Sequence, residues 1–176
     1  MLDSSIFYIP QELKSIGAFA HIDGSFKLDQ IDLGPDLYTL TKPIEFSLDL
    51  SNTGSSLLAT GKVWVEAQVD CARCIEPFDI ELTGEVSNYY IFPHIEIDDD
   101  LQDDEFEMIA EEGSLDLKNA LVAALILDAP LIPLHDEACK GLCASCGANL
   151  NTESCSCEDE VDDDMNPFAR LKDLKL

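Results

Sequence analysis

Seven cysteines are the residues best able to do chemistry in this chain of 176 residues. Five of them lie between Cys139 and Cys157, in the stretch CKGLCASCGANLNTESCSC. Cysteines this close together serve as disulfide partners, metal ligands or redox centres. The odd total argues against a closed disulfide framework, so metal binding is the first chemistry to test.

Four cysteines of this stretch have the spacing of one tetrahedral metal site. Cys143 and Cys146 form C-x2-C, and Cys155 and Cys157 follow as C-x-C. Gly147 comes directly after the first pair, where glycine tolerates positive φ and lets backbone amides approach sulfur. The segment is short and polar, so burial alone would not order it. We therefore predict a structural zinc site with these four cysteines as ligands.

The other three cysteines suggest a second site. Cys71 and Cys74 repeat the C-x2-C spacing, and Cys139 stands alone, four residues after His135. Seven cysteines and one histidine make eight ligands, enough for two tetrahedral ions. The alternative is that Cys71 and Cys74 are free thiols at a hairpin tip and His135 is an ordinary polar residue.

Catalytic readings of these cysteines fit less well. Redox C-x2-C pairs lie at a helix N-terminus, whereas both pairs here are expected in hairpin or knuckle turns. Zinc sites made only of thiolates leave no open position for water. The chain also has no Gly-rich phosphate loop, G-x-S-x-G or H-E-x-x-H. The prediction is a protein that is not an enzyme.

The charge of the chain restricts its partners. It carries 36 acids against 10 Lys and Arg, for a formal charge of −26. Two runs, 96–107 and 158–164, hold much of the excess and could be solvated loops. No basic stripe is present to neutralise phosphates, so DNA is a poor ligand and a basic protein suits the charge better.

Hydrophobic alternation predicts an antiparallel sheet in the middle of the chain. Three segments, starting at Pro43, Leu57 and Phe78, have apolar residues at every second position. We interpret them as a three-strand meander with Cys71 and Cys74 at the tip of the second hairpin. The expected inward residues are Ile44, Phe46, Leu48, Leu50, Val63, Val65, Ala67, Val69, Phe78, Ile80, Leu82 and Val86.

One helix is expected to cover this sheet. Ser114 is the predicted N-cap and Asp116 lies in the predicted first turn, where the helix dipole favours an acid. Leu117, Leu121 and Leu125 recur on one face, and Pro130 ends the helix.

The ends of the chain give weaker patterns. IPQELKSIGAFAHI could start a helix, GSFKLDQIDL alternates like a strand, and NPFARLKDLKL could form a helix capped by Asn166 with Pro167 at its first position. The predicted class is α+β: an antiparallel meander or partly closed sheet covered by a helix, in residues 1–134. Residues 135–176 are predicted to form a Cys-rich zinc module and a C-terminal tail.

Three stretches resemble a known family. They are VDCARCIEPFDIEL, PLIPLHDEACKGLCASCGANLNTESCSC and the terminal NPFARLKDL. They are similar to the YceD family, called large ribosomal RNA subunit accumulation protein or domain of unknown function 177. The resemblance runs from about Ser47 to the C-terminus. It implies a role in accumulation or processing of 23S rRNA, and hence in large-subunit assembly.

Two function classes follow. The first is a non-enzymatic assembly factor that binds a basic large-subunit ribosomal protein, 23S rRNA or its precursor. The second is a metal-dependent nuclease, which would need clustered carboxylates for Mg²⁺. The bases available for RNA or partner contacts are Lys62, Arg73, Lys140, Arg170, Lys172 and Lys175.

A cytoplasmic location without membrane contact is also expected. The first residues contain an early acid and no apolar h-region. The longest apolar run, ALVAALIL from Ala120 to Leu127, is too short to span a bilayer.

Overall fold

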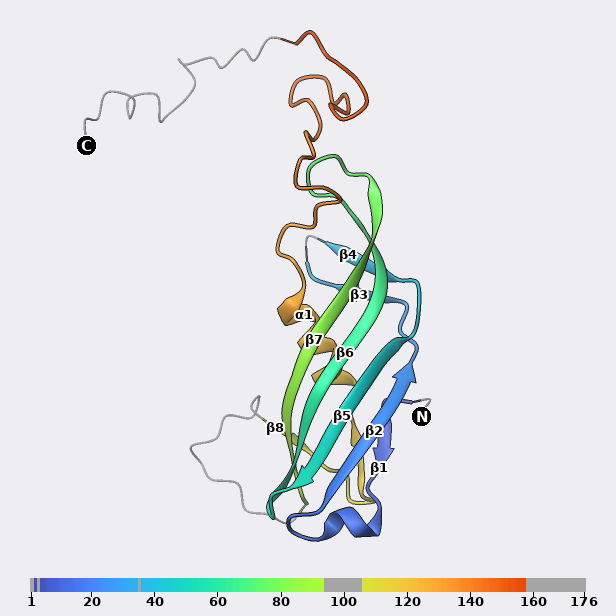
Figure 1. Ribbon diagram of the computed structural model, residues 1–176, viewed down its shortest axis with the longest axis vertical. Coiled ribbons are helices and arrows are strands. Elements are labelled where there is room, and N and C mark those ends of the chain that lie inside the picture. The colour runs from blue at the N-terminus through green and yellow to red at the C-terminus, as the bar shows by residue number, and fades with distance from the viewer. Residues whose placement is uncertain (1, 3, 35, 94–105, 158–176) are drawn as a thin grey trace, which may run out of the picture.

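A twisted, open sheet and one helix make up most of the structure (Figure 1). The computed structural model describes residues 2, 4–34, 36–93 and 106–157. The strands are β1 (Ile6–Tyr8), β2 (Phe19–Phe26), β3 (Gln30–Asp32), β4 (Leu37–Leu40), β5 (Ile44–Asn52), β6 (Ser56–Asp70), β7 (Pro77–Ile91), β8 (Phe106–Met108) and β9 (Ser114–Asp116). The helices are the 3-10 turn η1 (Gln11–Lys14) and the α-helix α1 (Lys118–Asp128).

A long hairpin of β6 and β7 positions the first cysteine pair. The two strands pair without a break from Ser56 opposite Ile91 to Asp70 opposite Pro77. β5 accompanies β6 only up to the pair of Glu45 with Trp64, so the hairpin continues beyond it. The turn that holds Cys71 and Cys74 is therefore the far tip of this hairpin, as Figure 1 shows.

The hydrophobic core lies on one face of the sheet. Period-two alternation puts the apolar side chains of β5, β6 and β7 on this face, as predicted for the meander. Of the predicted inward residues, Phe78 and Ile80 are half-buried at the edge of the core and the other ten are buried. The opposite face of the sheet is polar and open to solvent in the described residues.

The sheet is open rather than a closed barrel. Its strands follow the order β2-β5-β6-β7, with β8 parallel to the end of β7. β4 pairs with β6 beyond the end of β5 and carries β3 along its other side. Among the described strands, nothing joins β2 to β8, so the sheet does not close into a barrel. β1 and β9 form a separate two-stranded sheet.

The helix begins later than the sequence predicted. Ser114 is not its N-cap, and Asp116 precedes it, because residues 114–116 form β9 and pair with β1. Asp116 still accepts a hydrogen bond from the Lys118 N–H at 2.9 Å. The predicted apolar face is correct, since Leu117, Leu121 and Leu125 are buried against the sheet. The described part of the chain contains no helix whose length and apolar character would let it span a bilayer.

The N-terminal helix expected from sequence is only a single turn. η1 covers four residues, and the following segment becomes β2, which pairs with β5 along its whole length. Tertiary pairing outweighs the weak local helix preference here. The predicted helix at 166–176 and most of both acidic runs lie outside the described residues.

Candidate metal centres

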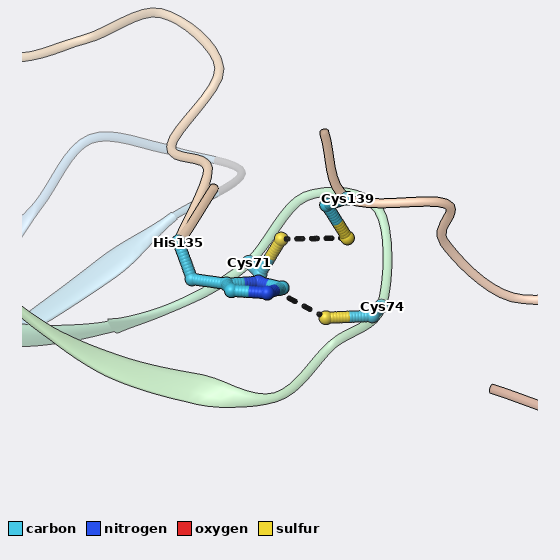
Figure 2. A group of neighbouring side chains, drawn as sticks. All are labelled: Cys71, Cys74, His135 and Cys139. Carbon is cyan, nitrogen blue, oxygen red and sulfur yellow. Dashed lines mark hydrogen bonds between the residues drawn. The ribbon is translucent and has the colours of Figure 1, made fainter. Parts of the chain in front are cut away.

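Four side chains meet at the tip of the β6–β7 hairpin, and we call them the hairpin centre: Cys71, Cys74, His135 and Cys139. Their ligand atoms all lie within 4.8 Å of one another. The sulfurs of Cys71 and Cys139 are 3.9 Å apart, and Cys74 Sγ is 3.5 Å from His135 Nδ1. Figure 2 shows the three sulfurs and the imidazole turned toward a common point. Each of the three cysteines is at most 5% exposed.

Apolar contacts attach this centre to the sheet. Phe78, Leu134 and Leu142 pack against its three cysteines. The ring of His135 also meets the ring of Phe78 edge-on, with 6.4 Å between their centroids. Since Phe78 is half-buried at the edge of the main core, the hairpin centre is continuous with the packed part of the fold.

A tight turn sets the two hairpin cysteines. The Ile75 N–H donates to the Cys71 carbonyl at 2.8 Å, and the Cys71 N–H donates to the Glu76 carbonyl at 2.9 Å. This closes the backbone around Cys71 Sγ and points amides at it. The turn requires Ile75 to adopt φ of 61°, a left-handed backbone conformation that is unusual and strained for a β-branched residue.

The remaining four cysteines form a second group, the knuckle centre: Cys143, Cys146, Cys155 and Cys157. Their sulfurs also lie within 4.8 Å of one another. Cys146 and Cys157 are exposed, and the other two are partly buried. All seven cysteines of the chain are free thiols, which is the state that metal binding requires.

The knuckle centre repeats the turn of the hairpin centre. The Gly147 N–H donates to the Cys143 carbonyl at 2.9 Å, and the Cys143 N–H donates to the Ala148 carbonyl at 2.8 Å. Gly147 has φ of 74°, at the position that corresponds to Ile75. The two C-x2-C segments therefore share a backbone geometry, with the residue after the second cysteine left-handed in both.

Backbone amides lower the pKa of one thiol in the hairpin centre. Burial raises the pKa of Cys71, but the backbone N–H groups of His135, Arg73 and Cys74 outweigh it and lower that pKa to about 5. The Glu76 backbone lowers the pKa of Cys74, yet burial and the neighbouring thiols prevail and raise it to about 11.

In the knuckle centre, too, the pKa of one thiol is lowered and that of another is raised. The backbone N–H groups of Cys146 and Ser145 lower the pKa of Cys143 to about 6. The hydrogen bond with Cys146, together with burial, raises the pKa of Cys157 to about 12. In both centres, backbone N–H groups thus lower the pKa of the first cysteine of the C-x2-C pair.

Arg73 ties the two centres together. Its guanidinium Nη1 donates to the carbonyls of Glu137 at 2.9 Å and Cys139 at 2.8 Å. Its own carbonyl accepts the Leu142 N–H at 3.0 Å. A Cβ on Gly141 would lie 3.0 Å from that carbonyl oxygen, so glycine permits this close approach.

Two asparagines complete the connection. Asn151 Nδ2 donates to Cys139 Sγ at 3.3 Å, and its Oδ1 accepts the Lys140 N–H at 2.8 Å. Asn149 Nδ2 donates to the Glu76 carboxylate at 2.9 Å. The N-L-N stretch between the knuckle cysteines thus bonds to a hairpin-centre ligand and to the hairpin itself, a role that sequence reasoning did not assign to it.

The structure brings together the same two sets of four residues that the sequence singled out. Metal ligation by them remains a prediction. Of the bases predicted for RNA or partner contacts, Arg73 is engaged with backbone carbonyls, while Lys140 and Lys62 are exposed. Arg170, Lys172 and Lys175 lie outside the described residues.

A polar cluster on the open face of the sheet was missed from sequence. His21 Nδ1 is 2.7 Å from Asp49 and its Nε2 is 3.3 Å from Asp23, while Ser47 Oγ lies 3.4 Å from Nε2. The hydrogen bond with Asp49 is the main cause of the raised pKa of His21. The arrangement resembles a Ser-His-Asp set, but Asp23 faces the same nitrogen as the serine and favours the imidazolium. The cluster acts as cross-strand pairing between β2 and β5.

Several curated proteins are similar to this chain. An uncharacterized protein of Mycobacterium tuberculosis is 26% identical over 132 residues, covering 74% of this chain and 63% of its own length. An uncharacterized protein of Mycobacterium leprae is 24% identical over 133 residues, covering 75% of this chain and 59% of its own. This chain thus spans about three fifths of these relatives.

A plant relative carries a descriptive name. It is the large ribosomal RNA subunit accumulation protein YCED homolog 1, chloroplastic, of Arabidopsis thaliana, which is 31% identical over 72 residues, or 40% of this chain and 22% of its own. No solved structure matches. Residues 59–175, which include all eight cysteine and histidine positions of both centres, match the family described as large ribosomal RNA subunit accumulation protein YceD. The chain belongs to the YceD family.

Proposed function

We propose that this protein is a non-enzymatic factor in biogenesis of the large ribosomal subunit, supporting accumulation or processing of 23S rRNA. The observation that carries the proposal is the family match over residues 59–175. That range contains the β6–β7 hairpin almost entirely, helix α1 and both centres. The part of the chain that matches the family therefore contains both cysteine groups.

Zinc is the ion we propose for both centres. Zn–S bonds of about 2.3 Å and Zn–N bonds of about 2.1 Å in a tetrahedron separate two sulfurs by about 3.8 Å, and sulfur from nitrogen by about 3.6 Å. The separations in the structure are 3.9 Å from Cys71 Sγ to Cys139 Sγ and 3.5 Å from Cys74 Sγ to His135 Nδ1. Thiolate and imidazole are also the donors that favour zinc over Mg²⁺ or Ca²⁺.

The role proposed for the ions is structural. Each centre offers four protein ligands, which fills a tetrahedral ion and leaves no position for a reacting water. In the hairpin centre the ion would join the sheet to the segment that follows α1. In the knuckle centre it would order residues 143–157.

A basic large-subunit ribosomal protein is the partner we favour. The formal charge of −26 supports this choice. Two divalent ions held by seven thiolates would leave the charge more negative still. 23S rRNA or its precursor is the other partner considered, through local bases such as Lys62 and Lys140, and such contacts should weaken steeply with salt.

Depletion of the protein from its native cells tests the pathway. The expected result is a fall in 23S rRNA relative to 16S rRNA, reversed by the parent protein. A variant with Cys71 and Cys74 both changed to Ser should restore it poorly, whereas the exposed Ser145→Ala variant, inside the knuckle turn, should restore it fully. An unchanged rRNA ratio after depletion would refute the proposed pathway.

Purified protein tests the non-enzymatic reading. Precursor rRNA incubated with the protein and Mg²⁺, Mn²⁺ or Zn²⁺ should remain intact on a gel. Cleavage that disappears in a variant lacking one centre would instead show a metal-dependent nuclease. Elemental analysis of the same preparation should find two zinc ions per chain.

A further inference from the structure

A groove runs between helix α1 and strand β7. Its main cavity has a volume of about 490 Å³ and is lined by Lys62, Thr83, Gly84, Glu85, Ala124, Leu127 and Asp128. A smaller hollow of about 120 Å³ continues it and shares Glu85, Ala124 and Leu127. The helix can lie this close because Gly84 has no side chain: a Cβ there would come within 2.6 Å of the Ala124 carbonyl.

In the described part of the chain, the edge of β7 that faces this groove is not paired with another strand over most of its length. β6 pairs along one edge of β7 throughout, while β8 pairs along the other only at Tyr89–Ile91. Within the described residues, the remainder of that second edge has no strand partner. The Glu85 N–H points outward and donates to Asp128 Oδ2 at 3.3 Å. Because backbone groups alternate along a strand, the Thr83 N–H faces the same way.

Exposed aliphatic side chains lie in the groove lining, at Leu127, and in the segment that follows α1. Leu127 is 83% exposed, Leu131 95% and Ile132 64%. The backbone that carries the last two is fixed on both sides, since the Pro130 carbonyl accepts Tyr38 Oη–H at 3.4 Å and the Pro133 carbonyl accepts the Ala72 N–H at 2.8 Å. Because this backbone is already fixed, it has little conformational entropy left to lose when a partner covers the two side chains.

Two aliphatic anchors favour a protein over RNA as the partner. RNA recognition depends on bases stacking on aromatic side chains and on cations facing phosphates. Leu131 and Ile132 supply neither. Apolar side chains are enriched at the buried centre of protein–protein interfaces.

The charge around the groove indicates the chemistry of that protein. No Lys or Arg occurs from Cys74 to Leu117, or from Asn119 to Cys139. Lys62, which reaches in from β6, is the one base among the groove-lining residues, against Glu85 and Asp128. A partner segment that bears Lys or Arg beside its apolar side chains complements this lining.

We propose that the α1–β7 groove, with Leu131 and Ile132 at its end, docks an extended segment of a basic protein. The segment adds to the open edge of β7, places apolar side chains against Leu127, Leu131 and Ile132, and places its cations near Glu85 and Asp128. This inference rests on the proposed function for the identity of the partner, a basic protein of the large subunit. It adds the surface that receives it.

Binding measurements on the full-length, metal-loaded protein test this surface. The probes are individually purified basic proteins of the large subunit and, separately, 23S rRNA fragments, both at physiological salt. The double variant Leu131→Ser/Ile132→Ser should weaken binding of the protein probe by about tenfold or more, as expected for interface anchors. Glu85→Lys should weaken it by about threefold or more, because it reverses a groove charge.

Matched variants at the opposite end of the molecule are the controls. Ile16→Ser changes an aliphatic residue that is 82% exposed beside η1, and Glu12→Lys reverses an exposed charge on η1 itself. Both should bind as the parent does. Changes at exposed positions leave the fold intact, which circular dichroism checks.

The outcomes separate the two proposals. If the parent binds none of the protein probes, the proposed partner class is wrong and this inference falls with it. If the parent binds a probe and the Leu131→Ser/Ile132→Ser variant binds it equally well, only the surface is wrong. If these variants reduce rRNA binding and leave protein binding unchanged, the groove serves RNA and the inference is overturned.

Discussion

In the hairpin centre three cysteines are at most 5% exposed, whereas in the knuckle centre Cys146 and Cys157 lie in solvent. Both centres use the same C-x2-C turn with the same pair of backbone hydrogen bonds. They differ in what surrounds the turn. The turn of the hairpin centre connects two fully paired strands and packs against Phe78. The turn of the knuckle centre lies in a stretch with little apolar burial of its own.

This difference indicates that one turn can serve two kinds of structure. In the hairpin centre, strand pairing holds the turn without an ion, so the proposed ion would add a cross-link to an ordered element. In the knuckle centre, the proposed ion would supply most of the stabilising free energy, as in small zinc modules. The hydrogen bonds of Asn149 and Asn151 couple the knuckle to the hairpin.

Metal removal should produce the largest contrast between the two centres. After chelation, amide hydrogen exchange should show loss of protection across residues 142–150 and unchanged protection in β5, β6 and β7. The reason is that structural zinc contributes on the order of 10 kcal/mol in modules that lack a core, whereas the sheet has one. Knuckle amides that stay protected in verified metal-free protein would show that the two regions do not differ in this way.

Single ligand substitutions should separate the centres next. Cys139→Ser should lower the metal content from two ions to one and loosen both the hairpin tip and the knuckle, because Cys139 lies between them. Cys146→Ser should also leave one ion but disturb only the knuckle. Elemental analysis and hydrogen exchange measure both effects. A parent with one ion, or a Cys139→Ser variant that keeps two, would contradict the assignment of the hairpin centre.

Much of this arrangement was accessible from the sequence, for physical reasons. The alternation in Ile44–Leu50 and Val63–Val69 predicts buried strand faces because side chains on a strand have period two. The eight-residue count of cysteine and histidine also selected the two groups that the structure brings together. The spacing of the four knuckle cysteines is local, so it can be read without knowing the fold, whereas Cys71 and Cys74 were assigned to His135 and Cys139 only by the count of ligands.

The parts that were wrong or missed depend on long-range pairing. Ser114 looked like a helix cap, but it pairs with Tyr8 across more than a hundred residues. His21 and Asp49 meet for the same reason, since β2 and β5 align them across the sheet. The bond from Asn151 to Cys139 likewise requires a turn geometry that the residue types alone do not specify.

A smaller effect is expected for the bond between the centres. Asn151→Ala removes the N–H donor to Cys139 Sγ, and loss of such a partner of a metal ligand lowers metal affinity by about 10- to 100-fold. The neighbouring Thr152→Ala variant, which removes an exposed hydroxyl with a 3.4 Å contact to a backbone carbonyl, is the control. Competition with a chromophoric chelator measures the affinity. Equal affinities for the two variants would mean that the asparagine does not couple the centres.

The smallest effect concerns the residue after each C-x2-C pair, where the two turns carry different side chains. Gly147→Ile places a β-branched residue at φ of 74°, with no other atom within 4 Å of its Cβ, so only backbone strain counts. That strain is about 1–2 kcal/mol, or roughly a 5- to 30-fold loss of metal affinity at the knuckle.

The reciprocal change, Ile75→Gly, relieves the strain at φ of 61° but adds about 0.5–1 kcal/mol of chain entropy to be lost on folding. The two terms nearly cancel, so the metal affinity of the hairpin centre should change by less than about fivefold. The paired strands already hold this turn, whereas no named strand of the described residues flanks the knuckle turn. Equal losses from both substitutions would show that strand pairing gives the hairpin turn no advantage over the knuckle.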